Sequence, residues 1–550
     1  MEELSVQSTQ TEGDRPGVPD APMVQGDQRA AFWVFVAAQG LIFIALIWNF
    51  HGGWFVADEW VFVAGRTAGN LSGLFHPYHE HWSTLPILYY RLLWNVVGIR
   101  SYIPYLVSVL IMHITIGFLL RSIMIRALVL RWIATLCALA FSLYGAGYSD
   151  ISYGFNVGFD GSILFGLLFL LAVDHAGAVR RRDVLGVVAG LAALMCSGIG
   201  VAMIVAVAIA ISLRHGVRRA LLLILPLAGI YLIWFITVGH GAFSKHSSLA
   251  ELVRFAALGV AFTFSSLGSS PIVGSLLAVL LIAGAVISIR SYGSAELRSR
   301  CAAPYSLLIG AVAFMLITGF GRADFSISSA ETYASSRYIY IVAAMLMPAI
   351  AVAASQVILR WSKAWLFVVA ILVLGIPGNI AVLHRNNHLH TSDDYRQFIL
   401  SIPRLPVSSR LPRSVLPDPY FDNSITLGWL LDGVKSGRIP APSPPPTQAQ
   451  ITDWTLQLAW QPGRSTTSGT CESLPLPAVA HVVSGTSMTI SGAVGIAAHY
   501  GVHRQSKTAL LRGSTHPVTY VSSWPFDLTI TPTLPRQSVT LCTPTLTRRF

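Results

Sequence analysis

The sequence predicts an all-α, polytopic membrane domain of about eleven transmembrane helices, followed by a small C-terminal β-sandwich-like domain. Only 11% of the 550 residues are charged, whereas 53% are hydrophobic. That charged share is less than half that of an ordinary soluble domain. Apolar runs able to cross a bilayer recur between residues 31 and 382, and residues 451–550 alternate Thr, Val and Ser in short runs. The bilayer must therefore solvate much of the chain.

Eleven apolar runs are candidates for crossing the membrane. Three of them, at 160–173, 184–197 and 199–213, are short for a hydrocarbon core of about 30 Å, so we expect longer or partly broken helices there. The stretch 250–268 is also apolar, but counting it as a crossing would put the basic loop after residue 289 on the opposite side. We therefore expect an interfacial or re-entrant helix. The runs are 31–49, 101–121, 128–147, 160–173, 184–197, 199–213, 219–238, 271–289, 303–320, 337–355 and 364–382.

Arginines gather in every second loop between these runs, as at 180–182 and 214–219. Cytoplasmic loops of membrane proteins carry such an excess of Lys and Arg. The pattern predicts a cytoplasmic N-terminus, whose residues 1–30 read as a disordered extension, and an extracytoplasmic C-terminal tail. The net charge of +12 thus reports membrane topology, and we expect no nucleic-acid partner.

The first outer loop, about residues 50–100, is far longer than a connection between helices requires. It contains adjacent carboxylates, Asp58 and Glu59, soon after the first apolar run. Such a pair can take a proton from a sugar hydroxyl, or bind a metal ion that holds a phosphate. A solvated acidic loop, or a helix cap by Asp58, is the structural alternative.

The same loop contains a run of histidines and aromatic residues from 76 to 82. If the segment is extended, alternation places His79 and His81 on one side, with Glu80 between them. These side chains could bind a metal ion or donate hydrogen bonds to a phosphate. Alternatively, the histidines cap a helix that begins near Pro86.

A later arginine, Arg337, stands before Tyr338 where the tenth apolar run begins on the outer side. A guanidinium at this boundary can pair with the phosphate of a lipid carrier, or it can extend to the interface without a ligand. Arg322 and Lys245 are weaker candidates for the same role.

Two further acids, Asp150 and Asp160, flank an aromatic outer segment. They could face an acceptor, but we interpret them as helix caps.

The tail divides into a Pro-rich linker region, 384–450, and a β-rich domain, 451–550. Short helices are expected at about 393–401 and 424–435 in the linker region. Cys471 and Cys542 are the only cysteines of the tail, so they are free to form a disulfide if the tail is extracytoplasmic. The other three cysteines lie in or beside apolar runs and read as inert core residues.

A long first outer loop with an Asp-Glu pair soon after the first membrane helix resembles the GT-C superfamily of membrane glycosyltransferases. These enzymes use polyprenyl-phosphate-linked sugars, and they include the actinobacterial arabinosyltransferases. The resemblance covers the topology of about residues 30–382 and this one short motif. It implies that Asp58 is the catalytic base, or a metal-linked carboxylate, with Glu59 as its neighbour.

The expected function is the transfer of a sugar from a polyprenyl-phosphate donor to a glycan, lipid or protein of the cell envelope. The protein would act in the plasma membrane, among membrane lipids. Arg337 would hold the phosphate leaving group, helped by Arg322 or by the segment with His79 and His81. The need for a divalent metal is left open.

Two other functions remain as alternatives. A transporter or flippase for a lipid-linked glycan would be favoured by charged residues in mid-helix, of which the sequence shows few. A non-catalytic scaffold of an envelope complex would use the tail as a binding module. We find no Gly-rich nucleotide loop with its lysine, so a cytoplasmic nucleotide-sugar donor is not expected.

Overall fold

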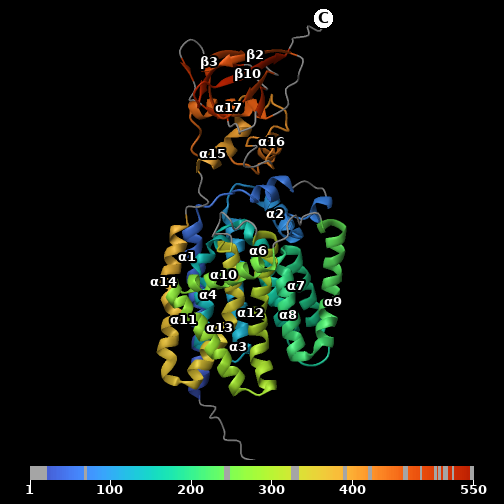
Figure 1. Cartoon of the computed structure of the whole chain (residues 1–550), viewed down its shortest axis with the longest axis vertical. Helices are drawn as coiled ribbons and strands as arrows, with labels where there is room; N and C mark the ends of the chain where they lie inside the picture. Colours follow the sequence, from blue (N-terminus) through green and yellow to red (C-terminus); the bar gives the residue numbers. More distant parts are fainter. Residues whose placement is uncertain are drawn as a thin grey trace, which may run out of the picture.

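The computed structural model describes residues 22–66, 71–240, 248–323, 333–387, 393–418, 424–462, 469–483, 486–500, 504–505, 509–511, 518–522 and 526–544. Over these residues the chain forms a tall bundle of helices with two β-sheets beyond one end (Figure 1). We call the end of the bundle that faces the sheets the tail-side end, and the opposite end the basic end.

The bundle is mostly helical, as the composition predicts. Among the described residues, nine helices are long and apolar enough to cross a membrane, and the bent pair α4–α5 would be a tenth. The eleven expected crossings are therefore shown only in part, because α7 and α8 have just 16 and 17 residues. The first helix begins at Pro22 rather than near residue 31. The helices are α1 (Pro22–Phe50), α2 (Thr84–Val96), α3 (Ile103–Arg126), α4 (Arg131–Ser142), α5 (Tyr148–Ser152), α6 (Val157–Val173), α7 (Arg181–Cys196), α8 (Ile199–His215), α9 (Val217–Trp234), α10 (Leu249–Leu267), α11 (Pro271–Ser291), α12 (Ser294–Arg322), α13 (Ser336–Arg360) and α14 (Trp365–Arg385).

Helix α13 is the centre of the bundle, because 94% of its most apolar stretch is buried. Small residues allow its neighbours to approach closely. A Cβ at Gly284 of α11 would lie 2.4 Å from the Cβ of Ala353 on α13, so glycine is required there. Close backbone approach of this kind drives helix association where lipid removes the hydrophobic contrast. The first turn of α13, which carries Arg337, is thus fixed to a rigid element.

Helix α10 meets the test of length and composition for a crossing, but its contacts show a tilted path. At its start, Leu252 and Phe255 contact Gly319 near the tail-side end of α12. At its end, the carbonyl of Leu267 meets Gly375 in the middle of α14. Helix α11 then begins at Pro271. The interfacial or re-entrant placement expected for 250–268 stays a prediction.

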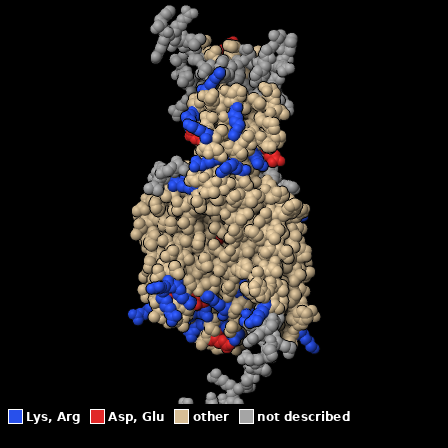
Figure 2. Space-filling view, turned by 180° about the vertical axis from the view of Figure 1, so that it is seen from behind, with Lys and Arg blue, Asp and Glu red and all other residues tan. Residues whose placement is uncertain are grey.

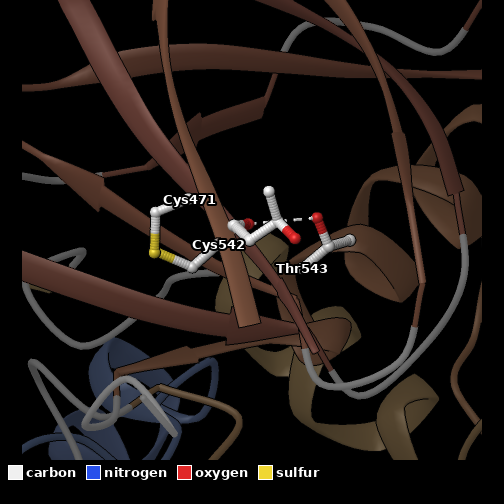
Figure 3. Close-up of a disulfide and its surroundings, with 4 residues drawn as sticks. Cys471, Cys542 and Thr543 are labelled. Atoms are coloured by element: carbon white, nitrogen blue, oxygen red, sulfur yellow. Dashed lines mark hydrogen bonds between the residues drawn. A yellow bond between two sulfur atoms is a disulfide. The ribbon is translucent and has the colours of Figure 1, made fainter. Parts of the chain in front are cut away.

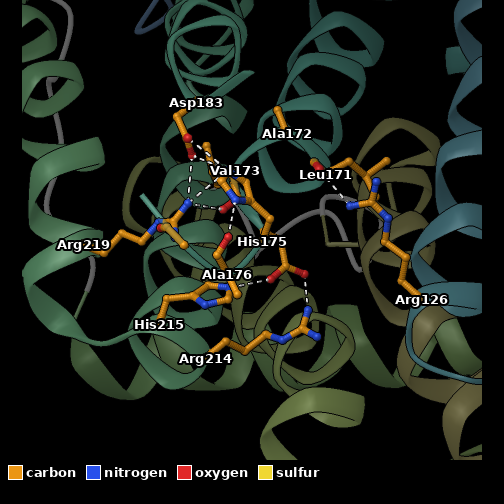
Figure 4. A network of polar contacts seen from close by, with 12 residues as sticks. Arg126, Leu171, Ala172, Val173, His175, Ala176, Asp183, Arg214, His215 and Arg219 are labelled. Carbon is orange, nitrogen blue, oxygen red and sulfur yellow. Dashed lines mark hydrogen bonds and ion pairs between the residues drawn. The ribbon is translucent and has the colours of Figure 1, made fainter. Parts of the chain in front are cut away.

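The basic end collects the arginine-rich loops. In Figure 2 a broad band with almost no charged residues separates the Lys and Arg side chains of this end from those near the sheets. Figure 4 shows how the loops are joined. Arg219 of α9 pairs with Asp183 of α7 at 3.0 Å, and Arg214 of α8 pairs with Asp174 after α6. These ion pairs join α6 through α9. A charge left there without its partner would be costly.

Residues 393–439 do not behave as a linker. Helices α15 (Asp393–Ser401) and α16 (Leu427–Lys435) match the two short helices predicted in this region. They pack on the long loop between α1 and α3, residues 51–102. Trp429 of α16 stacks on Trp94 of α2 with ring centroids 4.6 Å apart. Proline content suggested an open connection, but buried aromatic contacts make this segment part of the main core.

The sheets form a two-layered β-domain, preceded by α17 (Gln448–Ala459) at the point where we expected strands. One sheet has the order β1-β8-β4-β10-β2 and the other β3-β9-β5-β6, with β7 beside β5. Side chains of both sheets share one hydrophobic core around Met488 and Ile530. The strands are β1 (Trp460–Pro462), β2 (Gly469–Pro475), β3 (Ala478–Val482), β4 (Ser487–Ile490), β5 (Val494–Tyr500), β6 (Arg504–Gln505), β7 (Ala509–Leu511), β8 (Val518–Ser522), β9 (Phe526–Pro532) and β10 (Ser538–Pro544).

The cysteine pair suggested by the sequence forms a disulfide. Cys471 on β2 and Cys542 on β10 are direct partners in the antiparallel register, and Figure 3 shows the bond beside Thr543. The bond therefore joins two cysteines that are 71 residues apart in the chain.

Replacing both cysteines with serine is expected to lower the stability of the β-domain by roughly 4 kcal/mol, because the unfolded chain loses a closed loop of about 70 residues. Thermal unfolding followed by limited proteolysis of the β-domain measures this effect. The Cys301→Ser variant, whose cysteine lies in α12, is the control and should leave the β-domain unchanged. Two free thiols at Cys471 and Cys542 in protein taken from the membrane would contradict the prediction.

Candidate functional site

The two acids of the long loop follow a tight turn and differ in their burial. Ala57 adopts a left-handed backbone conformation with φ of 44°, after which Asp58 is half-buried and Glu59 is 0% exposed. Glu59 Oε1 accepts hydrogen bonds from the hydroxyls of Tyr90 (2.8 Å) and Tyr102 (3.1 Å). Glu59 Oε2 accepts one from the backbone N–H of Val56 (3.2 Å). Glu59 therefore anchors the loop, whereas Asp58 keeps access to solvent.

Burial has a clear electrostatic consequence for Glu59. It raises the pKa of this carboxyl from 4.5 to about 8, even though the hydrogen bonds from Tyr90, Val56 and Tyr102 lower the pKa. Desolvation wins because an enclosed carboxylate loses more hydration than three donors return.

A stability profile against pH tests this shift. The pKa of Glu59 is higher in the folded than in the unfolded protein, so its contribution to stability is complete below about pH 4.5 and is lost as the pH rises through about 8. We expect the Glu59→Gln variant to remove a slope of up to about 1.4 kcal/mol per pH unit in that window. The measurement is the unfolding temperature between pH 4.5 and 9. The exposed Glu296→Gln variant serves as the control, and identical slopes in all three proteins would refute the assignment.

Asp58 is linked to Tyr78, a residue that we did not select from the sequence. The Tyr78 hydroxyl hydrogen-bonds to Asp58; burial, and then the charge of Asp58, raises the pKa of Tyr78. Arg66 holds the loop around Tyr78 by donating to the carbonyls of His76 (3.0 Å) and Pro77 (2.8 Å). Tyr78 also lies within electrostatic reach of Arg337.

The histidine segment is a turn, not an extended strand, and this corrects our expectation. Tyr78 and His81 form a β-bridge, and His79 between them has φ of 48°. His79 is exposed and contacts the Tyr78 ring, whereas the Nδ1 of His81 accepts a hydrogen bond from the backbone N–H of Gly198 at 3.2 Å. The two imidazoles therefore do not share one side. Neither caps α2, whose N-cap is Ser83.

Glu80, the carboxylate of this segment, already has a charged partner within the protein. Glu80 forms an ion pair of 2.7 Å with Arg322 at the end of α12. Burial raises the pKa of Glu80, but His81 and Arg322 outweigh it and the net pKa is lowered. Burial lowers the pKa of His81 to about 4, so its imidazole is neutral at pH 7. Arg322 therefore connects the long loop to the bundle. Lys245, the other weaker candidate for the phosphate, lies outside the described residues.

A large cavity opens at the tail-side end of the bundle, and Arg337 is one of its walls. We call it the Arg337 cavity, and its volume is about 1150 Å³. It is lined by the segment before α6, the end of α10, and the starts of α11 and α13 together with α14. Many of the lining side chains are hydroxyls: Tyr148, Ser149, Tyr153, Ser265, Ser266, Ser269, Ser270, Ser335, Ser336 and Tyr338.

The guanidinium of Arg337 forms no ion pair or hydrogen bond with any residue that the structure describes. It lies over the rings of Tyr338 (5.5 Å to the ring centroid) and Phe159 (6.0 Å). The amide oxygen of Asn156, a buried residue in the cavity wall, also has no partner within the described chain. A cation and a polar group without internal partners are features of a ligand site rather than of a packed core.

Tyr153 connects the cavity to the acidic turn. Tyr153 lines the cavity, and its hydroxyl donates to the carbonyl of Val56 at 2.8 Å, two residues before Asp58. Neither Asp58 nor Glu59 lines the cavity itself. The structure thus brings Asp58, Tyr78 and Arg337 to one region and places the acid at its edge.

The caps that we predicted at Asp150 and Asp160 are wrong. The N-cap positions of α5 and α6 are Gly147 and Asn156, whereas both acids are 0% exposed in the first turns of these helices. None of their four oxygens has a hydrogen-bond partner among the described residues.

Sequence reasoning missed the serine-rich wall. The signal was present in the pairs Ser265-Ser266 and Ser269-Ser270, which interrupt two apolar runs, but its meaning depends on which helices meet there. Within the described part of the chain, no group of three His, Cys, Asp or Glu side chains converges to hold a metal ion. Comparisons with family models, with curated proteins and with solved structures find no match to this chain.

Proposed function

We propose that the protein is a GT-C-like membrane glycosyltransferase that uses a polyprenyl-phosphate-linked sugar on the extracytoplasmic face. The observation that carries the proposal is the guanidinium of Arg337, which has no ion pair or hydrogen bond among the described residues and lines a cavity of about 1150 Å³ at one end of a bundle of apolar helices. In this reading the basic end is cytoplasmic, since the arginine-rich loops gather there. The tail-side end then faces the extracytoplasmic space.

The walls of the cavity suit a phosphate. Helix α11 begins at Ser270-Pro271 and α13 at Ser335-Ser336, and both starts line the cavity. Helix N-termini present free N–H groups and a partial positive charge, which favour anions. Arg337 adds a full charge and a planar fork of donors matched to phosphate oxygens. The serine and tyrosine hydroxyls suit the hydroxyl groups of a sugar.

The chemistry proposed for this site is a single displacement. Asp58 accepts the proton of an acceptor hydroxyl, and the freed oxygen forms a bond to the anomeric carbon. The bond from that carbon to the phosphate oxygen breaks, and its electron pair leaves with the phosphate, which Arg337 stabilises. The hydrogen bond from Tyr78 orients Asp58 for this step.

Binding of a lipid phosphate tests the proposal directly. We expect the Arg337→Ala variant to bind farnesyl phosphate roughly 10- to 150-fold more weakly than the wild type, because a charge-assisted hydrogen bond contributes about 1.5–3 kcal/mol. The measurement is titration calorimetry of the full chain in lipid nanodiscs. Arg360→Ala, at the other end of the same helix, is the matched control. Equal affinities in the three proteins would remove Arg337 from the phosphate site.

One observation favours the transporter alternative. His113, Asp150 and Asp160 are all 0% exposed inside the bundle, and buried ionisable groups often mark transport pathways. A flippase would move a labelled lipid phosphate between the leaflets of reconstituted vesicles without transferring any sugar. Such movement by the wild type, unaffected by Asp58→Asn, would favour the transporter.

A further inference from the structure

The hydroxyl groups that line the Arg337 cavity have a defined hydrogen-bond polarity. In α10, the hydroxyls of Ser265 and Ser266 donate to the carbonyls four residues earlier, at 3.2 and 2.7 Å. The same kind of contact is made in the wall by Ser269 to Gly375 (2.7 Å), Ser336 to Ala146 (2.7 Å) and Tyr153 to Val56 (2.8 Å). A carbonyl can only accept, so each of these hydroxyls has already used its single proton. What each oxygen offers to a ligand is therefore a lone pair.

The side-chain amide of Asn156 adds another acceptor to the same wall. Its Nδ2 donates to the hydroxyl of Ser149 at 3.1 Å, and its Oδ1 has no hydrogen-bond partner among the described residues. Asn156 is 1% exposed and lines the cavity. A buried amide oxygen without a donor is unfavourable, so a ligand that supplies a donor gains affinity there. We call the five hydroxyls and the Asn156 amide the acceptor wall.

Hydrogen bonds between helices hold the acceptor wall in this arrangement. The hydroxyl of Ser336 on α13 also accepts from the backbone N–H of Ser149 at 3.1 Å. Asn379 of α14 donates to the hydroxyl of Ser269 at 3.0 Å and accepts from the N–H of Ala146 at 3.1 Å. The donors of these neighbouring groups are thus used within the protein. Turning one hydroxyl towards a ligand acceptor would break a bond that the protein already makes.

The polarity of the acceptor wall limits what can bind against it. Acceptor oxygens suit either the hydroxyl of a ligand or a metal cation. Arg337 lines the same cavity, and its positive charge opposes a cation. The phosphate of a lipid-linked sugar is a diester and has no proton to donate, so it does not match the wall either. Neutral hydroxyl groups that donate are the remaining match.

We propose that the acceptor wall is the sugar subsite of the Arg337 cavity and that it recognises sugar hydroxyls as hydrogen-bond donors. This inference rests on the proposed function, which assigns the phosphate to Arg337. A guanidinium only donates and a phosphate diester only accepts, whereas the wall accepts. The two parts of the cavity therefore hold a lipid-phosphate sugar in one orientation. A sugar that lacks a hydroxyl at the right ring position leaves acceptors of the wall without partners, and such a site rejects it.

Titration calorimetry of the full chain in lipid nanodiscs measures what the wall contributes. The probes are the farnesyl phosphate diesters of D-arabinofuranose, D-mannose and D-glucose, and farnesyl methyl phosphate, which has the same charge without a sugar. We expect at least one sugar diester to bind the wild type roughly 5- to 100-fold more tightly than the methyl diester. This ratio is the sugar gain. Replacing single hydroxyls of that sugar with fluorine, which has no proton to donate, should remove most of the gain at one or more positions.

Variants of the wall test which residues produce the sugar gain. The Ser265→Ala, Ser266→Ala double variant should lower the gain and leave the affinity for the methyl diester unchanged, because both hydroxyls bond only within their own helix. Asn156→Leu should lower it too. Asn156→Asp keeps an acceptor oxygen and adds a charge that acts on both diesters, so its gain should persist. Ser122→Ala, which removes the same kind of bond from α3 outside the cavity, is the matched control.

The outcomes separate the sugar subsite from the phosphate site. Equal affinities of the wild type for all four diesters would overturn the subsite, and so would fluorinated sugars that bind like their parent at every position. A sugar gain unchanged in the serine double variant and in Asn156→Leu would also overturn it; if Asn156→Leu does not fold, the serine variant decides. Equal binding of the methyl diester to the wild type and to Arg337→Ala would instead refute the phosphate assignment, and a sugar gain that persists there would support the subsite.

Discussion

Replacing Asp58 with Asn is expected to lower sugar transfer by about 10²–10⁴-fold, the usual contribution of a general base. Asparagine keeps the size of the side chain and can still accept the hydrogen bond from Tyr78, but it cannot take a proton from the acceptor. Binding of farnesyl phosphate should remain close to wild type, because Asp58 does not line the Arg337 cavity. The expected signature is therefore a loss of turnover without a loss of donor affinity.

The measurement is the transfer of labelled sugar in membranes of a strain that lacks the protein, complemented by each variant. Glu296→Gln, an exposed acid at the basic end, is the control for loss of a negative charge. Wild-type rates with Asp58→Asn would exclude this residue and move the base to Glu59 or Glu80. If rates stay at wild type when all three acids are changed, the scaffold function becomes the better account.

Replacing Gly145 with Ala is expected to destabilise the bundle and to disturb the Arg337 cavity together. A Cβ at Gly145 would lie 1.8 Å from the carbonyl oxygen of Asn379 on α14, so one backbone must move. Asn379 lines the cavity and accepts a hydrogen bond from the N–H of Ala146 at 3.1 Å. Overpacking of this kind typically costs about 1–3 kcal/mol, and a clash with backbone lies at the upper end. We expect farnesyl phosphate binding to weaken as well.

The matched control is Gly229→Ala in α9. A Cβ there meets nothing within 4 Å, and alanine is favoured over glycine in a helix interior by about 1 kcal/mol. Thermal unfolding in one detergent should therefore move the two variants in opposite directions. Equal unfolding temperatures would show that α14 is not held against Gly145 in the way that the structure describes.

Local signals in the sequence were enough for several features. The apolar runs predicted the helical bundle, because a bilayer accepts only segments that satisfy their own backbone hydrogen bonds. The start of α13 at Ser336, next to Arg337, lies within one residue of the run expected from hydropathy. The pairing of Cys471 with Cys542 followed from counting the cysteines of the tail, since only two were available there.

The roles of the acids and histidines were decided by the tertiary structure. Asp58 and Glu59 are neighbours in the chain, yet Tyr90 and Tyr102 enclose one and leave the other accessible. Arg322 is 242 residues from Glu80, the partner that occupies it. Likewise, the serines and Asn156 become one cavity only where four separate segments of the chain meet.

The physical reason for this division is the separation along the chain over which each kind of interaction acts. Hydropathy, helix capping and loop charge depend on residues within a few positions of one another, so the sequence by itself determined the helices and the segregation of arginine. Burial and counter-charge depend on contacts between segments hundreds of residues apart. Asp150 and Asp160 show the difference: in the sequence they look like ordinary helix caps, and the packing of the bundle buries both of them completely. Only the tertiary structure could decide that.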